Sequence, residues 1–331
     1  MRKHFTILGI FTAAICAIMF MGCGDDDEDE ELTGGESSTF SLGITDNSGG
    51  THNGNSTLTL DFNGTPNATT IVPAKVSSGD ISLDGSDSDW AGIEGSTVLL
   101  SPMSGSNDID SATLKGAYDE DSIYFLVSWT DPTSTESVNK NMWTYSGGAW
   151  TQSGNEDRVF FLWNINATDF EGRGCLVYCH DDAWMGTNSP GETVDTWHWK
   201  SARTEPVGIA DDKYWVDETV AEDVLDEGSR LADSGSGTAS DNKADGLPEL
   251  MSADDPGANV VFLHKDSTVP FDANAAWSDG DTVSGYVLKP GDGSRADVQT
   301  KAVYADGVWT VEFKRLLDTG NSDDHSFLPP L

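Results

Sequence analysis

Short stretches that alternate apolar and polar residues recur along this chain, separated by turn-forming residues. An apolar or aromatic residue at every second position is the pattern of a strand with one buried face. The stretches are 56–62, 112–118, 122–129, 158–164, 300–305 and 308–313. No long stretch of the sequence carries a convincing helical period. The pattern therefore predicts an all-β fold, an antiparallel β-sandwich with long functional loops.

The pattern divides the chain into three parts. Residues 1–23 carry a short positive start and an uncharged apolar run, which predict a signal peptide rather than a membrane-spanning helix. Residues 24–70 are acidic and rich in Gly, Ser and Thr, so we expect a tether. Residues 71–331 are expected to form one domain with a core. Within it, 165–260 is poor in strand signals and is expected to supply functional loops.

The end of the apolar run predicts lipid attachment at Cys23. Gly22 precedes Cys23, and an almost wholly acidic run from Asp25 to Glu31 follows at once. This arrangement resembles the bacterial lipobox, with Phe20 and Met21 in place of the usual Leu and Ala or Ser. We expect an exported cell-envelope lipoprotein, on the periplasmic face or in the outer membrane, that touches the membrane only through lipid. An ordinary secretory signal or an uncleaved anchor is the alternative.

The charge of the chain is strongly negative. It has 18 Lys and Arg against 56 Asp and Glu, a net charge of −38. Such a chain repels phosphate backbones, so nucleic acid is excluded as an expected partner. The acidic surface serves either solubility alone or the docking of basic electron-transfer partners, and composition favours the first.

The cysteine count isolates one pair. Cys16 leaves with the signal peptide and Cys23 takes the lipid, so Cys175 and Cys179 remain, in an oxidising compartment. With His180 they form a C-x3-C-H cluster. The pair is expected to be a disulfide or to attach haem covalently, although covalent attachment normally uses C-x2-C-H. Zinc has no visible fourth ligand there.

Further candidate ligands follow the cysteine pair. If residues 196–202 are extended, His198 and Lys200 share one face of the strand and Trp197 and Trp199 the other. Together with Met185, these side chains include three types of axial ligand for haem iron, and apolar walls suit its ring. The haem-pocket walls are expected from Trp184, Trp197 and Trp199.

Several stretches, taken in order, carry a family resemblance. They are 81–85 with 89–90, 116–119, 128–131, 157–165, 174–180, 195–203 and 309–315. Over roughly residues 76 to 328 the chain resembles the haem-binding domain of the ethylbenzene dehydrogenase gamma-subunit family, related to the cytochrome domains of dimethyl sulfide dehydrogenase-type enzymes. The resemblance implies a β-sandwich that binds one haem b and passes electrons to a redox partner, such as a multihaem cytochrome or a molybdoenzyme, without being a catalyst itself.

The resemblance also implies a ligand pair. The best-known members use a Met and a Lys, and Met185 is the position that matches the Met. The family's Lys lies late in the domain, where this chain stops at Leu331, so the gene is truncated or this branch uses Lys200 or His198. His180 is the ligand expected if haem is attached covalently, and haem b is favoured over haem c. The next candidates are Lys289 and His264.

Two classes of function follow from the sequence. The first is a haem electron carrier of the cell envelope, and the second is a carbohydrate-binding β-sandwich module without haem. The eleven tryptophans suit either class, because exposed indoles also stack on sugars. A Soret band distinguishes the two.

Lipid attachment at Cys23 has a direct test. Cells grown with labelled palmitate should label the wild-type protein, and Cys23→Ala should remove the label because the acceptor thiol is gone. Equal labelling of both proteins would contradict lipid attachment at this cysteine.

Overall fold

The computed structural model divides the chain into two compact units, Met1–Thr33 and Gly34–Leu331. It describes parts of the second unit only: residues 37–45, 51–54, 58–64, 69–104, 109–131, 141–170, 186–217, 230–254 and 261–328. Within these ranges, no helix has the length and hydropathy needed to cross a membrane.

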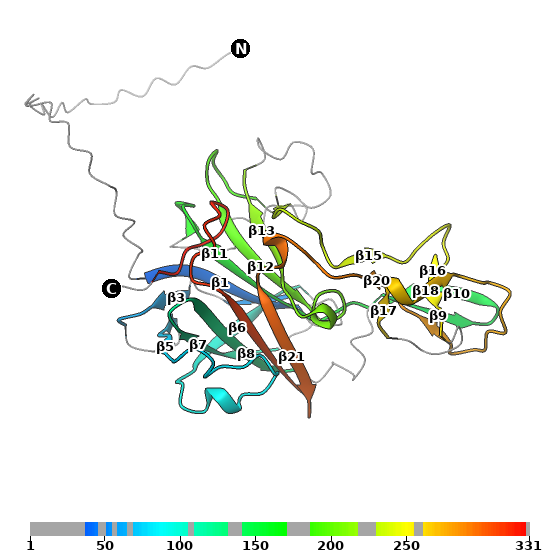
Figure 1. Ribbon diagram of the computed structural model, residues 1–331, viewed down its shortest axis with the longest axis horizontal. Coiled ribbons are helices and arrows are strands. Elements are labelled where there is room, and N and C mark those ends of the chain that lie inside the picture. The colour runs from blue at the N-terminus through cyan, green and yellow to red at the C-terminus, as the bar shows by residue number, and fades with distance from the viewer. Residues whose placement is uncertain are drawn as a thin grey trace, which may run out of the picture. The chain divides into compact units, whose positions relative to one another are not determined.

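A large sheet forms the body of the second unit (Figure 1). Its hydrogen-bonded order is β14-β13-β12-β11-β1-β2-β6-β7-β8-β22-β21, with β3 pairing β1 and β4, and β5 pairing β7. The strands are β1 (Ser37–Thr45), β2 (Thr51–Gly54), β3 (Leu58–Asp61), β4 (Thr70–Ile71), β5 (Ala74–Lys75), β6 (Ser96–Ser104), β7 (Ser111–Tyr118), β8 (Ser122–Thr130), β11 (Arg158–Asn164), β12 (Val194–Lys200), β13 (Asp211–Trp215), β14 (Arg230–Ala232), β21 (Gln299–Ala305) and β22 (Val308–Leu316).

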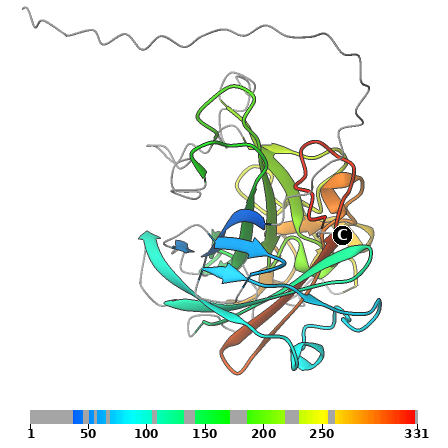
Figure 2. The ribbon, with the colours of Figure 1, turned by 90° about the vertical axis from the view of Figure 1, so that its left-hand side faces the viewer.

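The two halves of this sheet pack face to face around an aromatic core (Figure 2). Phe161 of β11 meets Phe313 of β22 edge to face, with ring centroids 5.2 Å apart, and Trp199 of β12 meets Trp309 of β22 at the same distance. The pairs along the main path are antiparallel, while β3 with β4 and β5 with β7 are short parallel pairs. The expected all-β antiparallel sandwich is confirmed.

Strand β8 is buried on both faces, which explains its nearly continuous apolar sequence. One face lies in the main core. The other contributes Tyr124 and Leu126 to a second cluster under the segment 81–93, which contains the 3-10 turn η1 (Ser88–Trp90). Glu312 of β22 fixes this segment: its carboxylate accepts hydrogen bonds from the backbone N–H of residues 84 and 85 and from Trp90 Nε1, at 2.7–2.8 Å.

Three small sheets are grouped beside the sandwich in Figure 1. They are β10-β9-β19, β15-β20-β17 and β16-β18. Their strands are β9 (Met142–Ser146), β10 (Ala149–Ser153), β15 (Ala239–Asp241), β16 (Leu250–Ser252), β17 (Leu263–His264), β18 (Thr268–Pro270), β19 (Thr282–Val283) and β20 (Tyr286–Leu288), with 3-10 turns η4 (Glu205–Val207), η5 (Lys265–Ser267) and η6 (Ser294–Ala296). The buried Asn242 joins them, since its amide donates to the carbonyls of Leu250 and Ser284 and its oxygen accepts from the N–H of Leu250.

The sequence located six of the strands and missed the start of the domain. The predicted stretches correspond to β3, β7, β8, β11, β21 and β22. The tether expected over 24–70 does not extend past residue 36, because β1 (Ser37–Thr45) runs through the core with Phe40, Leu42 and Ile44 fully buried. The interval 165–260 is also richer in strands than expected, since it holds β12 to β16. Strand β1 is rich in Ser and Thr and so resembles a loop in composition, whereas β14, β15 and β16 have only three residues each, too few to show an alternating pattern.

The carboxylate of Glu312 gives a stability prediction. Glu312→Ala leaves two buried N–H donors and one partly buried N–H donor without an acceptor, so we expect a loss of roughly 3 kcal/mol in the free energy of unfolding. Glu312→Gln, which keeps one acceptor oxygen, should lose less. Denaturant unfolding measures both, with the exposed Glu94→Ala as control. A Glu312→Ala protein as stable as the control would show that these bonds do not hold the segment.

Candidate functional site

Strand β12 separates two environments. Trp197 and Trp199 point into the core and are fully buried, as the alternation along the strand requires. His198 and Lys200 point the other way, into a cavity of about 370 Å³. The face of β12 away from the core, together with the matching faces of β11 and β13, is called the outer face below.

The cavity is lined almost wholly by bases. Six Lys and Arg side chains, out of 18 in the whole chain, lie in its described lining. The lining residues are Arg158, His198, Lys200, Arg203, Asp211, Lys213, Arg230, Thr238, Ala239 and Arg295. In a chain of net charge −38, this is a local concentration of positive charge around one carboxylate.

Strand register explains how these bases meet. Arg158 of β11 lies directly opposite Lys200 of β12, and His198 lies opposite Asp211 of β13. Residues opposite one another in an antiparallel pair share a face of the sheet. Lys213, two residues after Asp211, therefore returns to the same face.

Asp211 is the counter-ion of the cavity. Lys200 Nζ lies 2.6 Å from Asp211 Oδ2, Arg295 donates from Nε to Asp211 Oδ1 at 2.6 Å, and Lys213 Nζ is 3.8 Å away. Burial alone would raise the pKa of Asp211, but these charges and hydrogen bonds hold it below its usual range. Asp211 is therefore ionised at neutral pH.

A second carboxylate positions two of the guanidinium groups. Glu156 is fully buried just before β11 and forms ion pairs with Arg203 and, at 3.4 Å, with Arg158. The ring of Tyr286 lies 5.1 Å from the Arg203 guanidinium carbon. These contacts pre-organise the two arginines at the cavity wall.

The two ligand candidates of the cavity carry basic nitrogens that are easily deprotonated. Burial, followed by the charge of Lys200 and nearby arginines, lowers the pKa of His198 well below its usual value. Burial also lowers the pKa of Lys200 to about 7, and Asp211 only partly opposes this shift. An imidazole and an amine without a proton have lone pairs that can bind a metal ion.

An apolar patch adjoins the cavity on the same outer face. Phe160, directly opposite His198, has its ring centroid 6.4 Å from the imidazole. It packs against a cluster made by Leu162, Ala167, Phe170, Val194 and Trp215. Phe160 lies across β1 at Gly43, where an added Cβ would stand 2.0 Å from the ring, so only glycine leaves room for it.

Haem, the group that the resemblance implies, requires ligands for its iron, partners for its two carboxylates and apolar surface beside its ring. Neutral nitrogen donors suit the iron, and the guanidinium groups that line the cavity suit the two carboxylates of the group. The patch around Phe160 supplies apolar surface beside them. The residues present on the outer face therefore fit a haem.

The structure unites some of the sequence-predicted residues and separates others. His198 and Lys200 share the cavity, whereas the Trp197 and Trp199 rings lie on the core side of β12. His264 and Lys289 are exposed and lie outside the cavity lining. Six further candidates fall outside the described residues: Cys23, Cys175, Cys179, His180, Trp184 and Met185. The segment that carries the last five begins after Phe170, a member of the apolar patch.

Sequence reasoning missed most of the lining. Arg158, Arg203, Arg230 and Arg295 come from separate elements and converge only through the strand order β14-β13-β12-β11 and the turn η6. The one available signal was the alternation in Asp211-Asp212-Lys213, which places the first and third side chains on one face.

Fold and site together define a β-sandwich with a basic cavity, a candidate ligand-binding site, on the outer face of one sheet. Residues 87–330 match the ethylbenzene dehydrogenase family, and the chain belongs to this family. The expected family is thereby confirmed. No curated protein sequence was found to match the chain.

The counter-ion of the cavity gives a stability prediction. Asp211→Asn removes the carboxylate shared by Lys200, Arg295 and Lys213, so we expect a loss of roughly 3 kcal/mol in the free energy of unfolding. Added sulfate should recover part of the loss by entering the basic cavity. Denaturant unfolding measures both effects, with the exposed Asp241→Asn as the matched control. If Asp211→Asn were as stable as Asp241→Asn, Asp211 would not act as a stabilising counter-ion of the cavity.

Proposed function

We propose that this protein is a haem-binding electron-transfer lipoprotein of the cell envelope. The proposal rests on the arrangement of side chains on the outer face of β11 to β13. There, two nitrogen donors with lowered pKa, His198 and Lys200, face a cavity rich in arginine beside an apolar patch. Membership of the ethylbenzene dehydrogenase family supports the same function.

Different residues of the chain would hold different parts of the haem. Lys200 or His198 would bind the iron from β12, with Met185 as the second ligand, and His180 would replace one of them if Cys175 and Cys179 attach haem covalently. The cavity arginines would hold the carboxylates, and the patch around Phe160 would exclude water. When bound, the group supplies one-electron redox chemistry, with haem b favoured over haem c.

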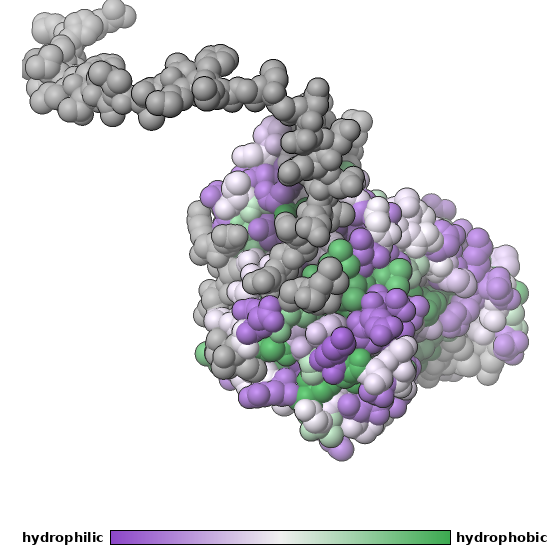
Figure 3. Space-filling model, turned by 60° about the vertical axis from the view of Figure 1, so that its left-hand side comes forward, coloured by the Kyte–Doolittle hydropathy of each residue, from purple (hydrophilic) through white to green (hydrophobic). Residues whose placement is uncertain are grey.

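The proposed partner is a redox protein rather than a small-molecule substrate. The family is part of multisubunit molybdoenzyme complexes, so a molybdoenzyme or a multihaem cytochrome is the partner class. A net charge of −38 would speed encounter with a basic partner surface. Hydrophilic residues are interspersed with apolar ones on the face shown in Figure 3. The lipid on Cys23 would keep the carrier at the membrane.

A sugar-binding module remains the second candidate, and one observation favours it. Eight of the eleven tryptophans are buried in the described part of the chain, but Trp150 and Trp277 are partly exposed on the small sheets. Their ring centroids are 4.9 Å apart, and Phe271 packs beside them. Such a group can stack on sugar rings.

The proposal is tested by spectra of the purified full chain. We expect a Soret band, and a pyridine haemochrome spectrum that identifies haem b. Single changes of the true axial ligands should convert the low-spin spectrum to high-spin, because the iron loses a strong ligand. The variants are Met185→Ala, His198→Ala, Lys200→Ala and His180→Ala.

Two exposed residues provide matched controls. His264→Ala and Lys289→Ala change the same residue types outside the cavity lining and should leave the spectrum unaltered. If all four site variants keep the wild-type low-spin spectrum, the ligand assignment is wrong. If the purified protein is colourless, takes up no haem and binds glycans, and if Trp150→Ala loses the glycan binding, the sugar-binding module is the correct function and the electron carrier is wrong.

A further inference from the structure

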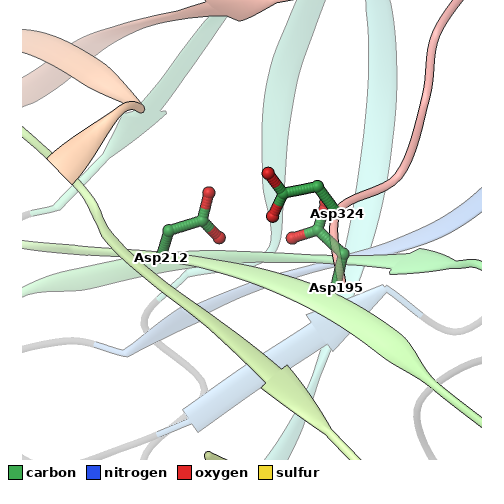
Figure 4. A group of neighbouring side chains, drawn as sticks. All are labelled: Asp195, Asp212 and Asp324. Carbon is green, nitrogen blue, oxygen red and sulfur yellow. The ribbon is translucent and has the colours of Figure 1, made fainter. Parts of the chain in front are cut away.

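A group of buried carboxylates lies on the core-side faces of β12 and β13, away from the cavity. Asp195 of β12 and Asp212 of β13 are fully buried, and Asp324 reaches them from the segment after β22. One carboxylate oxygen of each lies within 4.8 Å of the other two. Figure 4 shows the three side chains converging from these separate segments.

The group extends beyond these three residues. Asp233 and Asp323 form a second such set with Asp324, and Asp297 adjoins Asp212. The ion pairs of the first three carboxylates within the described structure run to one cation, Arg315, which is itself fully buried. Three of these six acidic groups pair with Arg315, and the described cluster carries a large excess of negative charge.

Four of the carboxylates have one oxygen anchored by hydrogen bonds. Asp195 Oδ2 accepts from Arg315 Nη1 and from the N–H of His325, at 2.8 and 2.9 Å. Asp324 Oδ2 accepts from the hydroxyl of Thr319 at 2.6 Å. Asp212 Oδ1 accepts from the N–H of Lys213, and Asp233 Oδ2 from the hydroxyl of Ser294. These bonds fix the direction in which each second oxygen points.

The second oxygens have no donor among the residues that the structure describes. Buried oxygens without a hydrogen bond are Asp195 Oδ1, Asp212 Oδ2, Asp233 Oδ1, Asp297 Oδ1 and Asp324 Oδ1. Arg315 Nη1 lies 3.7 and 3.8 Å from the free oxygens of Asp212 and Asp324, beyond hydrogen-bond distance. A buried charged oxygen without a partner costs several kcal/mol, so the cluster needs a further cation or protons.

The geometry favours one class of cation. Ca²⁺ binds six to eight oxygens at 2.3–2.6 Å, so opposite ligands stand about 5 Å apart. Three carboxylate oxygens within 4.8 Å of one another, supplied by three separate segments, match that spacing. Mg²⁺ demands a smaller octahedral shell that keeps waters, and Zn²⁺ prefers nitrogen and sulfur.

We propose that Asp195, Asp212 and Asp324 bind a Ca²⁺ ion through their free oxygens, with Asp233 and Asp297 beside it. The ion would join β12 and β13 to the segment 317–328, whose Phe327 is buried in the main core. This site is independent of the haem proposal, because its ligands lie on the other side of β12 and β13.

Two measurements on the purified full chain test the site. At constant ionic strength, Ca²⁺ at about 100 times its Kd should raise Tm over that in EDTA by roughly 5 °C, and Mg²⁺ should raise it much less. Tb³⁺ should bind in place of Ca²⁺ and luminesce when tryptophan is excited. The Trp197 ring lies 4.7 Å from the guanidinium carbon of Arg315, beside the cluster.

Isosteric variants separate cation binding from folding. Asp212→Asn and Asp324→Asn keep the shape of the side chain and remove one charge, so both should lose the Ca²⁺ shift and the Tb³⁺ signal. Their Tm in EDTA should equal or exceed that of the wild type, because repulsion within the cluster falls. The exposed Asp266→Asn should behave as the wild type.

Three outcomes would overturn the proposal. The first is an equal wild-type Tm in Ca²⁺ and EDTA without Tb³⁺ luminescence, which would mean that protons alone neutralise the cluster. The second is a Ca²⁺ shift that survives in both variants, which would place the ion elsewhere. The third is a Tm shift with Mg²⁺ as large as that with Ca²⁺, which would show that the site is not selective for Ca²⁺.

Discussion

The two-residue alternation of β12 is the constraint on which both charged sites depend. Trp197 and Trp199 lie in the core, so His198 and Lys200, which alternate with them, are placed on the outer face. The same rule divides β13, where Asp211 joins the basic cavity and Asp212, its neighbour in sequence, joins the acidic cluster. One pair of strands therefore holds a concentration of positive charge on one face and of negative charge on the other.

Among the residues that the structure describes, each site has an excess of one sign of charge. Asp211 and Glu156 pair with several bases of the cavity, and the remaining positive charge suits an anionic group. Arg315 pairs with the carboxylates of the cluster, and the remaining negative charge suits a cation. Burial makes both imbalances costly, which is why each indicates a bound species rather than a stabilising ion pair.

The sequence predicted what short-range periodicity determines. The strands of 122–129 and 308–313 and the shared face of His198 and Lys200 follow from alternation alone. Alternation cannot say which face of β12 meets the core, so Trp197 and Trp199 were assigned to a pocket wall. The convergence of Arg230 and Arg295, or of Asp324 on Asp195, depends on strand order and on a late segment, which no local pattern records.

Gly43 links the first strand to the chemistry of the outer face. The Phe160 ring rests on its bare backbone, and the same ring stands beside His198. A methyl group at position 43 would push the ring aside without altering any charge near the imidazole. The packing of a neutral residue on the first described strand therefore sets the position of an aromatic ring beside His198.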